Sequence, residues 1–510
     1  MGSDRSCYPV NLRQLLEQRT NAAPEKHFLL SEADGRRFTY AVFDAAVNRT
    51  AALLLSEGVR KGDIVSLLMP NSAEYIIAYF ACWKIGALAG PVNSLVKAHE
   101  AAYVIGNSEA KALLVHPDLL SIIQPVRHEL HALKSVVLFN DEARATRDFT
   151  AAAPPEADLT KDDEAIIIYT SGTTGKPKGC LLTHGNVIAN ARQISEWLDF
   201  TDDDRLLTIM PLFHMNAVSV TTMSALYAGG STVISPKFSA SRFWQIVSDY
   251  QITSFGSVAT MLSMLLSTYP AGVPAGLNTN QLRFAMCGSA PVPAEVMKRF
   301  EETFNCPVVE GYGLSESTCR STFNPPDERR RPGSCGLAIG NEMRVVDEND
   351  EEVPDGQLGE IVLRGENILK GYFKDSEATA TAFRGGWFHT GDIGYRDSDG
   401  FFYIVDRKSD MIIRGGENIY PREIDEVLYQ HPAVASAAAI GVPDPLYGED
   451  VAAFIVLKDG MKVDEGDILA FCLERLADYK CPKTVRFIKE IPKGPTGKLL
   501  KRELAKLAEE

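Results

Sequence analysis

Residues 169–179 read Tyr-Thr-Ser-Gly-Thr-Thr-Gly-Lys-Pro-Lys-Gly, and their chemistry suits the binding of a polyphosphate. Glycines let backbone N–H groups converge on an anion, hydroxyl groups add donors, and lysines add positive charge. A flexible surface turn is the alternative, because glycine-rich loops with hydroxyl groups are common. A P-loop is excluded, because Lys176 is followed by Pro177 and Thr170 stands where the first glycine is required.

Four other segments carry side chains that could serve nucleotide or acyl chemistry. They are Met210-Pro211-Leu212-Phe213-His214, Cys287-Gly288-Ser289-Ala290-Pro291, Glu310-Gly311-Tyr312-Gly313-Leu314-Ser315-Glu316-Ser317 and Gly386-Trp387-Phe388-His389-Thr390-Gly391-Asp392. In the third, an aromatic ring can stack on a base, a hydroxyl can reach a phosphate, and a carboxylate can hold a hard divalent cation. In the others, a histidine could contact substrate, a glycine turn could admit a flat ligand, and an aspartate could accept both ribose hydroxyls. Each also has an ordinary structural reading as a packed histidine, a strand-to-helix turn or a capped turn.

The tail carries one more candidate, in residues 492–498, Pro-Lys-Gly-Pro-Thr-Gly-Lys. Its prolines and glycines predict a turn that projects Lys498 ahead of a helix-like run over residues 499–507. A solvated surface lysine is the alternative.

The composition is that of a globular protein, with 45% hydrophobic and 23% charged residues over 510 positions. This length favours two or more domains. A formal net charge of -15 argues against nucleic acid or an anionic membrane as the main partner, so local lysines and arginines must attract any anionic substrate. Nine cysteines without a C-x-x-C pair predict neither a disulfide framework nor a zinc site. No signal peptide is recognised after Met1, so we expect a cytoplasmic protein.

The elements that must position these residues alternate along the chain. Residues 12–19 are typical of an amphipathic helix, and the apolar residues of 43–54 fall at helical spacing. Residues 63–69 and 165–168 are typical of buried strands, and the second of these feeds the loop at 169–179. The apolar stretch 75–92 is interrupted by charge, glycine and proline, so it predicts a buried helix and strand and no membrane segment. This order predicts an α/β domain with largely parallel sheets, followed by a small antiparallel β subdomain over residues 333–364.

A second unit is expected after residue 408. The strand 401–405 leads into Asp406-Arg407-Lys408-Ser409-Asp410, where we place the boundary. Beyond it the sequence predicts a strand at 411–413, a helix from Pro421, strands at 435–442 and 451–457, a helix at 467–476 and a strand at 484–488. An α+β unit of roughly 100 residues is a credible small domain. We therefore expect residues 1–408 to form an N-terminal domain and residues 409–510 a C-terminal domain.

These motifs together resemble those of the adenylate-forming (ANL) superfamily. The loop at 169–179 is similar to its phosphate-binding signature, and 312–316 is similar to its Tyr-Gly-x-Thr-Glu signature with Ser315 in place of threonine. The motifs span the whole chain in the family order. The resemblance implies an AMP-forming acyl-CoA synthetase that converts a carboxylic acid and ATP to acyl-AMP and pyrophosphate, and then passes the acyl group to coenzyme A with release of AMP. It also implies that the C-terminal domain is a mobile lid that carries the catalytic lysine.

The resemblance also implies roles for individual residues. Lys498, Glu316 and His214 are the expected catalytic residues, with Glu316 as the Mg²⁺ ligand and His214 lining the acyl pocket and gating entry of the thiol. The residues expected at ATP or AMP are Thr170, Ser171, Gly172, Thr173, Thr174, Gly175, Lys178, Gly288, Ser289, Ala290, Gly311, Tyr312, Gly313, Ser315, Asp392, Ile404 and Arg407. The expected acyl pocket is lined by His214, Asn216, Ala217, Val258, Gly288, Leu314 and Cys319. Ser409, Gly415, Gly416 and Glu417 are expected at the hinge and the coenzyme A channel, although the family usually has Asp or Lys where this chain has Ser409.

Several alternatives remain open at this point. The chain could load a carrier protein in trans, act as a luciferase-like oxidase, or be a catalytically silent nucleotide-binding homologue. An ADP-forming phosphotransferase is opposed by the failed P-loop. The expected acyl pocket is mostly small or apolar, which favours a small or medium carboxylic acid. A stretch around residues 237–244 resembles carnitine/crotonobetaine–CoA ligases.

Overall fold

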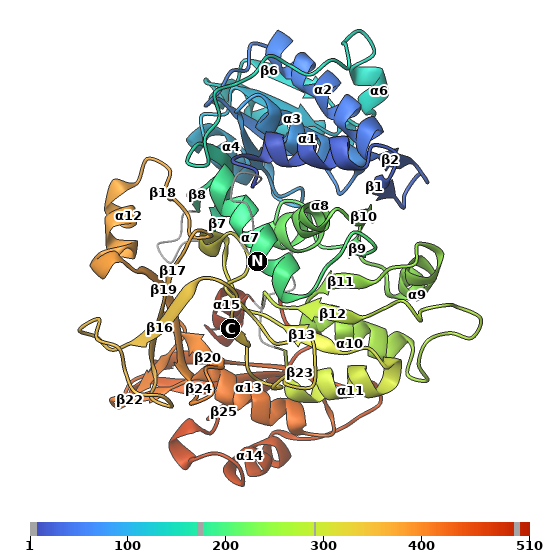
Figure 1. Ribbon diagram of the computed structural model, residues 1–510. Coiled ribbons are helices and arrows are strands. Elements are labelled where there is room, and N and C mark those ends of the chain that lie inside the picture. The colour runs from blue at the N-terminus through green and yellow to red at the C-terminus, as the bar shows by residue number, and fades with distance from the viewer. Residues whose placement is uncertain (1–7, 171–176, 290–291, 494–499, 510) are drawn as a thin grey trace.

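The computed structural model of the chain describes residues 8–170, 177–289, 292–493 and 500–509 (Figure 1). Within them the strands form two sheets of seven strands, one of four, one of five and a two-stranded ribbon. Helices alternate with strands through the two large sheets, most of whose strand pairs are parallel. The predicted α/β class with largely parallel sheets is therefore confirmed.

The first large sheet carries the glycine-rich segments that follow Cys287 and Glu310. Its order is β13-β12-β11-β9-β10-β1-β2, and each neighbouring pair is parallel except β1 with β2. Its strands are β1 His27–Ser31, β2 Arg37–Thr39, β9 Arg205–Thr208, β10 Ser231–Ile234, β11 Ser254–Ser257, β12 Phe284–Cys287 and β13 Val308–Glu310. The helices between them are α8 Ser224–Ala228, α9 Ala240–Asp249, α10 Ala259–Thr268 and α11 Ala294–Phe304. Because parallel strands end at one edge of a sheet, the loops after β12 and β13 lie side by side.

The second large sheet carries both ends of the phosphate-type loop. Its order is β18-β8-β7-β4-β3-β5-β6, parallel from β7 to β6 and antiparallel at β18-β8-β7. Its strands are β3 Ile64–Leu68, β4 Leu88–Pro91, β5 Ala112–Val115, β6 Ser135–Leu138, β7 Glu164–Thr170, β8 Lys178–Thr183 and β18 Gly371–Tyr372. Its neighbouring helices are α4 Ala98–Asn107, α5 Leu120–Ile123, α6 Glu142–Ala145 and α7 His184–Trp197. The antiparallel pair β7–β8 brings Thr170 opposite Lys178.

Helix α3, Ala73–Lys84, is the centre of the N-terminal core, and every one of its side chains is buried. A helix that is largely apolar on all sides is expected in a protein interior. Helices α1, Leu12–Ala22, and α2, Tyr40–Ser56, pack against it. The buried ammonium group of Lys84 forms ion pairs with Asp44 at 2.7 Å and Glu17 at 3.2 Å, which offsets part of the cost of removing its charge from water.

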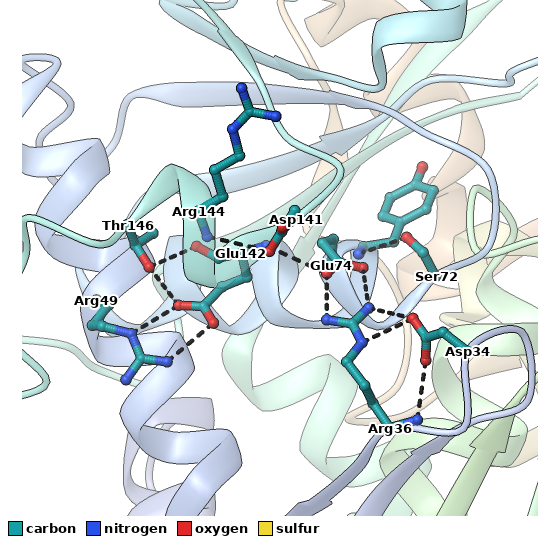
Figure 2. Close-up of polar contacts among 10 residues, drawn as sticks. Asp34, Arg36, Arg49, Ser72, Glu74, Asp141, Glu142, Arg144 and Thr146 are labelled. Atoms are coloured by element: carbon teal, nitrogen blue, oxygen red, sulfur yellow. Dashed lines mark hydrogen bonds and ion pairs between the residues drawn. The ribbon is translucent and has the colours of Figure 1, made fainter.

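A network of partly buried ion pairs links this core to the peripheral segments (Figure 2). Arg36 donates to both carboxylate oxygens of Glu74 at 2.8 and 3.1 Å and to Asp34 at 2.8 Å. Arg49 donates to both oxygens of Glu142 at 3.0 Å. The hydrogen bonds to Glu74 raise the pKa of Arg36. These bidentate pairs fix the β1–β2 turn to α3, and α6 to α2.

An antiparallel subdomain follows, as expected. Its sheet has the order β16-β17-β19-β20, and a ribbon of β14 and β15 precedes it. The strands are β14 Thr322–Phe323, β15 Leu337–Ala338, β16 Glu342–Val346, β17 Gly359–Arg364, β19 Phe388–Arg396 and β20 Phe402–Arg407, with helix α12 at Ser376–Ala382. Strand β20 is the last element of this sheet.

The segment after β20 forms a separate sheet with its own hydrophobic core, shown in orange to red in Figure 1. The sheet order is β22-β21-β24-β23, with β25 parallel to β24. Its elements are β21 Ile412–Arg414, β22 Glu417–Ile419, α13 Pro421–Gln430, β23 Val434–Asp444, β24 Gly448–Leu457, α14 Glu465–Leu473, β25 Thr484–Phe487 and α15 Lys501–Glu509. Its core packs Ile424 and Leu428 of α13 and Ile468 of α14 against this sheet. No helix within the described residues is both long and apolar enough to cross a membrane.

Candidate active site

The loops after β12 and β13 touch each other at glycines. Cys287 pairs with Glu310 in the parallel register, and the backbone N–H of Gly311 donates to the carbonyl of Cys287 at 2.9 Å. A Cβ on Gly288 would lie 2.5 Å from the carbonyl oxygen of Gly311, and a Cβ on Gly313 would lie 2.0 Å from the carbonyl oxygen of Cys319. These positions therefore require glycine because other backbone segments take the side-chain space.

Tyr312, in the loop after β13, meets Asp392 of β19 and Arg407 of β20. The Tyr312 hydroxyl donates to Oδ2 of Asp392 at 2.5 Å, and Nε of Arg407 lies 3.2 Å from Oδ1 of the same carboxylate. Asp392 and Arg407 face each other in the β19–β20 register. The carboxylate of Asp392 raises the pKa of Arg407, and burial is the main cause that raises the pKa of Tyr312. A phenol ring beside a buried carboxylate offers a stacking face for a base and acceptors for ribose hydroxyls.

A second group forms around Glu316, on the single turn Ser315–Ser317. The hydroxyl of Tyr372 donates to Oε1 of Glu316 at 3.3 Å. Tyr372 pairs with Cys180 across β18 and β8, and Nζ of Lys178 lies 5.3 Å from the centre of its ring. The carboxylate of Glu316 and the ammonium group of Lys178 therefore share Tyr372 as a neighbour, at the end of the hairpin that bounds the phosphate-type loop.

The expected acyl-pocket residues lie beside the loop after β12. The side-chain amide of Asn216 donates to Oγ of Ser289 at 3.4 Å, which joins an expected acyl-pocket residue to an expected nucleotide residue. Asn216 begins a π-helical segment, Asn216–Met223, and such segments are frequent at functional sites. His214 precedes it, with its ring 4.6 Å from that of Phe213. Ala217, Val258 and Cys319 are buried, whereas Leu314 is half-buried.

The expected hinge and coenzyme A residues lie where the chain passes into the last sheet. Ser409 is exposed and its hydroxyl donates to Asp410 at 3.1 Å. Gly415 and Gly416 form the β21–β22 turn with φ values of 59° and 91°, in the left-handed region that favours glycine. Helix α13 contacts β20 through Arg422: its backbone N–H donates to Asp406 at 3.0 Å, and its guanidinium donates to the carbonyl of Ile404.

Seven of the expected site residues lie outside the described residues. They are Ser171, Gly172, Thr173, Thr174 and Gly175 of the phosphate-type loop, Ala290 after β12, and Lys498.

Sequence reasoning missed three residues that the structure places beside the expected site residues: Tyr372, Glu310 and Arg320. Tyr372 had no local signal, because an antiparallel pairing far from it in sequence brings it to Glu316. Glu310 ends β13 and is buried, and burial raises its pKa to about 7. Arg320 is a single charge within the otherwise uncharged run 317–323, and that isolation could have marked it.

The comparisons with known proteins cover nearly the whole chain. The profile described as AMP-binding enzyme matches residues 16–373, and that of the AMP-binding enzyme C-terminal domain matches residues 423–498. A sulfoacetate–CoA ligase of Cupriavidus necator is 37% identical over 504 residues, 97% of either chain. A long-chain-fatty-acid–CoA ligase of Mycobacterium tuberculosis is 37% identical over 500 residues, 97% of this chain and 98% of its own.

Solved structures show the same arrangement. The ATP-bound form of MatB from Rhodopseudomonas palustris superimposes with a TM-score of 0.91 at 31% identity, covering 98% of this chain and 99% of its own. The ligand-free form of MatB gives a TM-score of 0.80 with the same coverage. An anthranilate CoA ligase in complex with anthranoyl-AMP gives 0.91 at 29% identity, covering 99% of this chain and all of its own.

Proposed function

The chain belongs to the AMP-binding enzyme family and is an ATP-dependent, AMP-forming acyl-CoA synthetase, and from this premise we propose how its residues share the two half-reactions. The observation that carries the proposal is the meeting of Tyr312, Asp392 and Arg407 beside the loops after β12 and β13. Tyr312 stacks on the adenine, Asp392 accepts the ribose hydroxyls, and Arg407 holds that carboxylate in place. Gly288, Gly311 and Gly313 allow the nucleotide to approach the backbone.

In the first half-reaction a carboxylate oxygen attacks the α-phosphorus of ATP, and the bond to the bridging β-phosphate oxygen breaks. The carboxylate and the phosphate are both anionic, so positive charge must offset the repulsion between them. Lys498 supplies that charge next to the bond that forms, and the loop 170–178 with Lys178 holds the departing pyrophosphate. Ser315 adds a hydroxyl donor to the phosphates.

Glu316 is the proposed Mg²⁺ ligand. Among the described residues no cluster of three or more His, Cys, Asp or Glu side chains could hold a metal. Mg²⁺ commonly takes one or two carboxylates together with phosphate oxygens of its substrate, so a lone glutamate held by Tyr372 fits this ion. When bound, Mg²⁺ neutralises charge on the triphosphate.

In the second half-reaction the thiol sulfur of coenzyme A attacks the acyl carbon and AMP leaves. We place the domain boundary at residue 408/409, since β20 belongs to the antiparallel subdomain and β21 to the last sheet. The last domain then turns about Ser409 to replace Lys498 by the turn at Gly415, Gly416 and Glu417, which borders the thiol channel. The arrangement described here is nearer to ATP-bound than to ligand-free MatB, which supports its assignment to the first half-reaction.

The experiment is a product analysis with purified enzyme, ATP, Mg²⁺, coenzyme A and a panel of carboxylic acids. We expect AMP and pyrophosphate in equal amounts, and acyl-CoA in the absence of any carrier protein. ADP as product, or acyl-AMP that passes only to an added carrier protein, would contradict the proposal. His214, Asn216, Ala217, Val258, Leu314 and Cys319 are the proposed acyl pocket, which suits a small or medium acid.

A further inference from the structure

Arg320 is a buried arginine with an incomplete set of partners. The residue is 2% exposed, and its Nε and Nη2 atoms have no hydrogen-bond partner among the described residues. Its backbone is fixed, because its N–H donates to Oδ1 of Asn190 at 3.2 Å and its carbonyl accepts from Asn190 at 2.7 Å and Asn367 at 3.2 Å. The unpaired guanidinium is therefore held in place by a well-bonded main chain.

The guanidinium lies directly against the loop after β12. A Cβ on Gly288 would be 2.6 Å from Nη2 of Arg320 and 2.9 Å from its Cζ. The Phe323 ring lies 5.3 Å from the same Cζ, within the range of a cation–π contact. The space that a side chain at position 288 would fill is thus shared by the carbonyl oxygen of Gly311 and the guanidinium of Arg320, beside a glycine expected at both the nucleotide and the acyl group.

Two other buried polar atoms lack partners near this loop. One is Oδ1 of Asn216, whose amide nitrogen donates to Ser289, the residue after Gly288. The other is Oε2 of Glu310, whose Oε1 accepts from the backbone N–H of Val292 at 3.1 Å. No ion pair joins Arg320 to Glu310 or to another described carboxylate, although the two charges are near enough to affect each other.

A buried guanidinium needs an anion. Arginine stays protonated in proteins, and a buried charge is stable only when it is paired or coordinated. Glu310 does not take this place in the structure, and burial raises its pKa, which makes it a weaker counter-ion than an ordinary carboxylate. The planar fork of donors matches a carboxylate or sulfonate group. The missing partner is therefore expected to arrive with a ligand.

The reacting carboxylate is a poor candidate for that partner. Its charge disappears when the acyl-phosphate bond forms, so it would leave the guanidinium unpaired during the second half-reaction. A second anionic group on the same acid keeps its charge through both half-reactions. Such a group would also keep the acyl end fixed while AMP is replaced by the thiol.

We propose that Arg320 binds a second anionic group, a carboxylate or a sulfonate, on the substrate acid, so that the enzyme selects short acids with two negative groups. This inference rests on the proposed function, because the adenylation reaction defines which group reacts and which is held. Arg320 is thus a specificity-determining residue, and Asn216, which donates to Ser289, is a neutral donor and acceptor beside the same loop.

The test compares short acids in matched sets that differ only at the far end. Each set contains three acids of the same length, which end in a carboxylate, a sulfonate or a neutral amide. Malonate, sulfoacetate and malonamate form one such set. Wild-type enzyme is expected to show a kcat/KM for AMP formation at least about 100-fold higher with the anionic acids than with the amide. The two anionic arms show which group the site prefers.

Arg320→Met should lower that ratio by about 100-fold, through a higher KM for the anionic acids, with little change for the amide or for the KM of ATP. Arg320→Lys should retain part of the preference, because an ammonium group keeps the charge but not the fork. If the methionine variant does not fold, the lysine variant provides the test of this preference. Arg364→Met is the control, since that arginine forms an exposed pair with Glu342, and it should leave the ratio unchanged.

Three results would overturn the inference. The wild-type enzyme could prefer the neutral acids, or Arg320→Met could keep the full preference. A rise in the KM of ATP that is the same for every acid would instead place Arg320 at the nucleotide. If wild-type enzyme forms no AMP with any acid, the proposed function fails; if it forms AMP but the ratio does not depend on Arg320, only this inference fails.

Discussion

Two regions of the molecule bury charged side chains, and they do so in opposite ways. Beside α3, Glu74 and Glu142 are 2% and 3% exposed, and both oxygens of each carboxylate accept hydrogen bonds from an arginine (Figure 2). Beside the loops after β12 and β13, Arg320 and Glu310 are equally buried, yet each has polar atoms without a partner.

The difference distinguishes charged side chains that stabilise the fold from charged side chains that are available to bind a ligand. Paired buried charges recover part of their desolvation cost and fix the elements that carry them. Unpaired ones lower stability, and native proteins retain few of them. Beside the loops after β12 and β13 the proposed substrate would offset this cost, because its second anionic group would pair with Arg320. Four substitutions test this division, from the largest expected effect to the smallest.

Lys498→Ala should remove a charge that contributes to catalysis and not to stability. We expect pyrophosphate exchange dependent on the carboxylic acid to fall by about 10³-fold, because the lysine offsets repulsion only as the carboxylate meets the phosphate. Transfer from supplied acyl-AMP to coenzyme A should be nearly unchanged, and so should the thermal midpoint. Lys506→Ala is the control, since Lys506 is an exposed lysine paired with Glu503 on α15. Equal losses in both half-reactions would contradict the assignment.

Glu74→Gln should remove a charge that contributes to stability and not to catalysis. The free energy of unfolding in denaturant titration should fall by about 2–3 kcal/mol, because Arg36 then lacks its bidentate partner. The effect is smaller than for a fully buried pair, since the Arg36 side chain is 37% exposed. Glu342→Gln, in an exposed pair with Arg364, should cost less than about 0.5 kcal/mol. A large loss of kcat/KM in the folded Glu74→Gln enzyme would show that the network is not merely structural.

Glu310→Gln should change how stability depends on pH. Burial raises the pKa of Glu310 from 4.5 to about 7, so between these values the folded state holds a proton that the unfolded state has lost. Wild-type stability therefore falls as the pH rises through this window, and the loss is complete above the folded-state pKa. The glutamine variant lacks this dependence and should gain stability relative to wild type as the pH rises from 4 to 8. The same difference at pH 4 and pH 8 would contradict a buried, titrating Glu310.

Arg320→Met should change stability least. Because Nε and Nη2 have no described partner, their removal should alter the free energy of unfolding by about 0.5 kcal/mol or less, or raise it. Urea titration of the ligand-free enzyme measures this. If Arg320→Met lowered the free energy of unfolding as much as Glu74→Gln, Arg320 would be a residue that stabilises the fold and not one that binds a ligand.

The sequence predicted the local elements well where a cap or a periodic apolar face marks them. The predicted helix at 12–19 is α1, whose start is set by Asn11 accepting the N–H of Gln14 at 2.9 Å. The helix expected at 467–476 begins earlier, at Glu465, because Asp464 caps it through the N–H of Asp467. The β-rich subdomain after residue 333 and the sheet after residue 411 also follow the predicted order.

The sequence named most residues of the candidate site but not the contacts between them. The sequence proposed Tyr312 and Asp392 for separate roles, and the structure joins them by a 2.5 Å hydrogen bond between the loop after β13 and strand β19. It gave no sign of Tyr372, because β18 reaches β8 only through tertiary pairing. Arg320 became notable only after folding had buried it.

By itself the sequence determined residue chemistry and local periodicity: a glycine- and lysine-rich loop, a Tyr-Gly-Leu-Ser-Glu run, a terminal lysine, and the alternation of helix and strand. These depend on neighbours a few positions away. Only the tertiary structure decided which buried charges are paired, because pairing depends on distances of a few ångströms between segments more than a hundred residues apart, such as Asn190 and Arg320. For this reason the arginine at position 36 stabilises the fold through its carboxylate partners, whereas the arginine at position 320 keeps donors that a ligand anion can use.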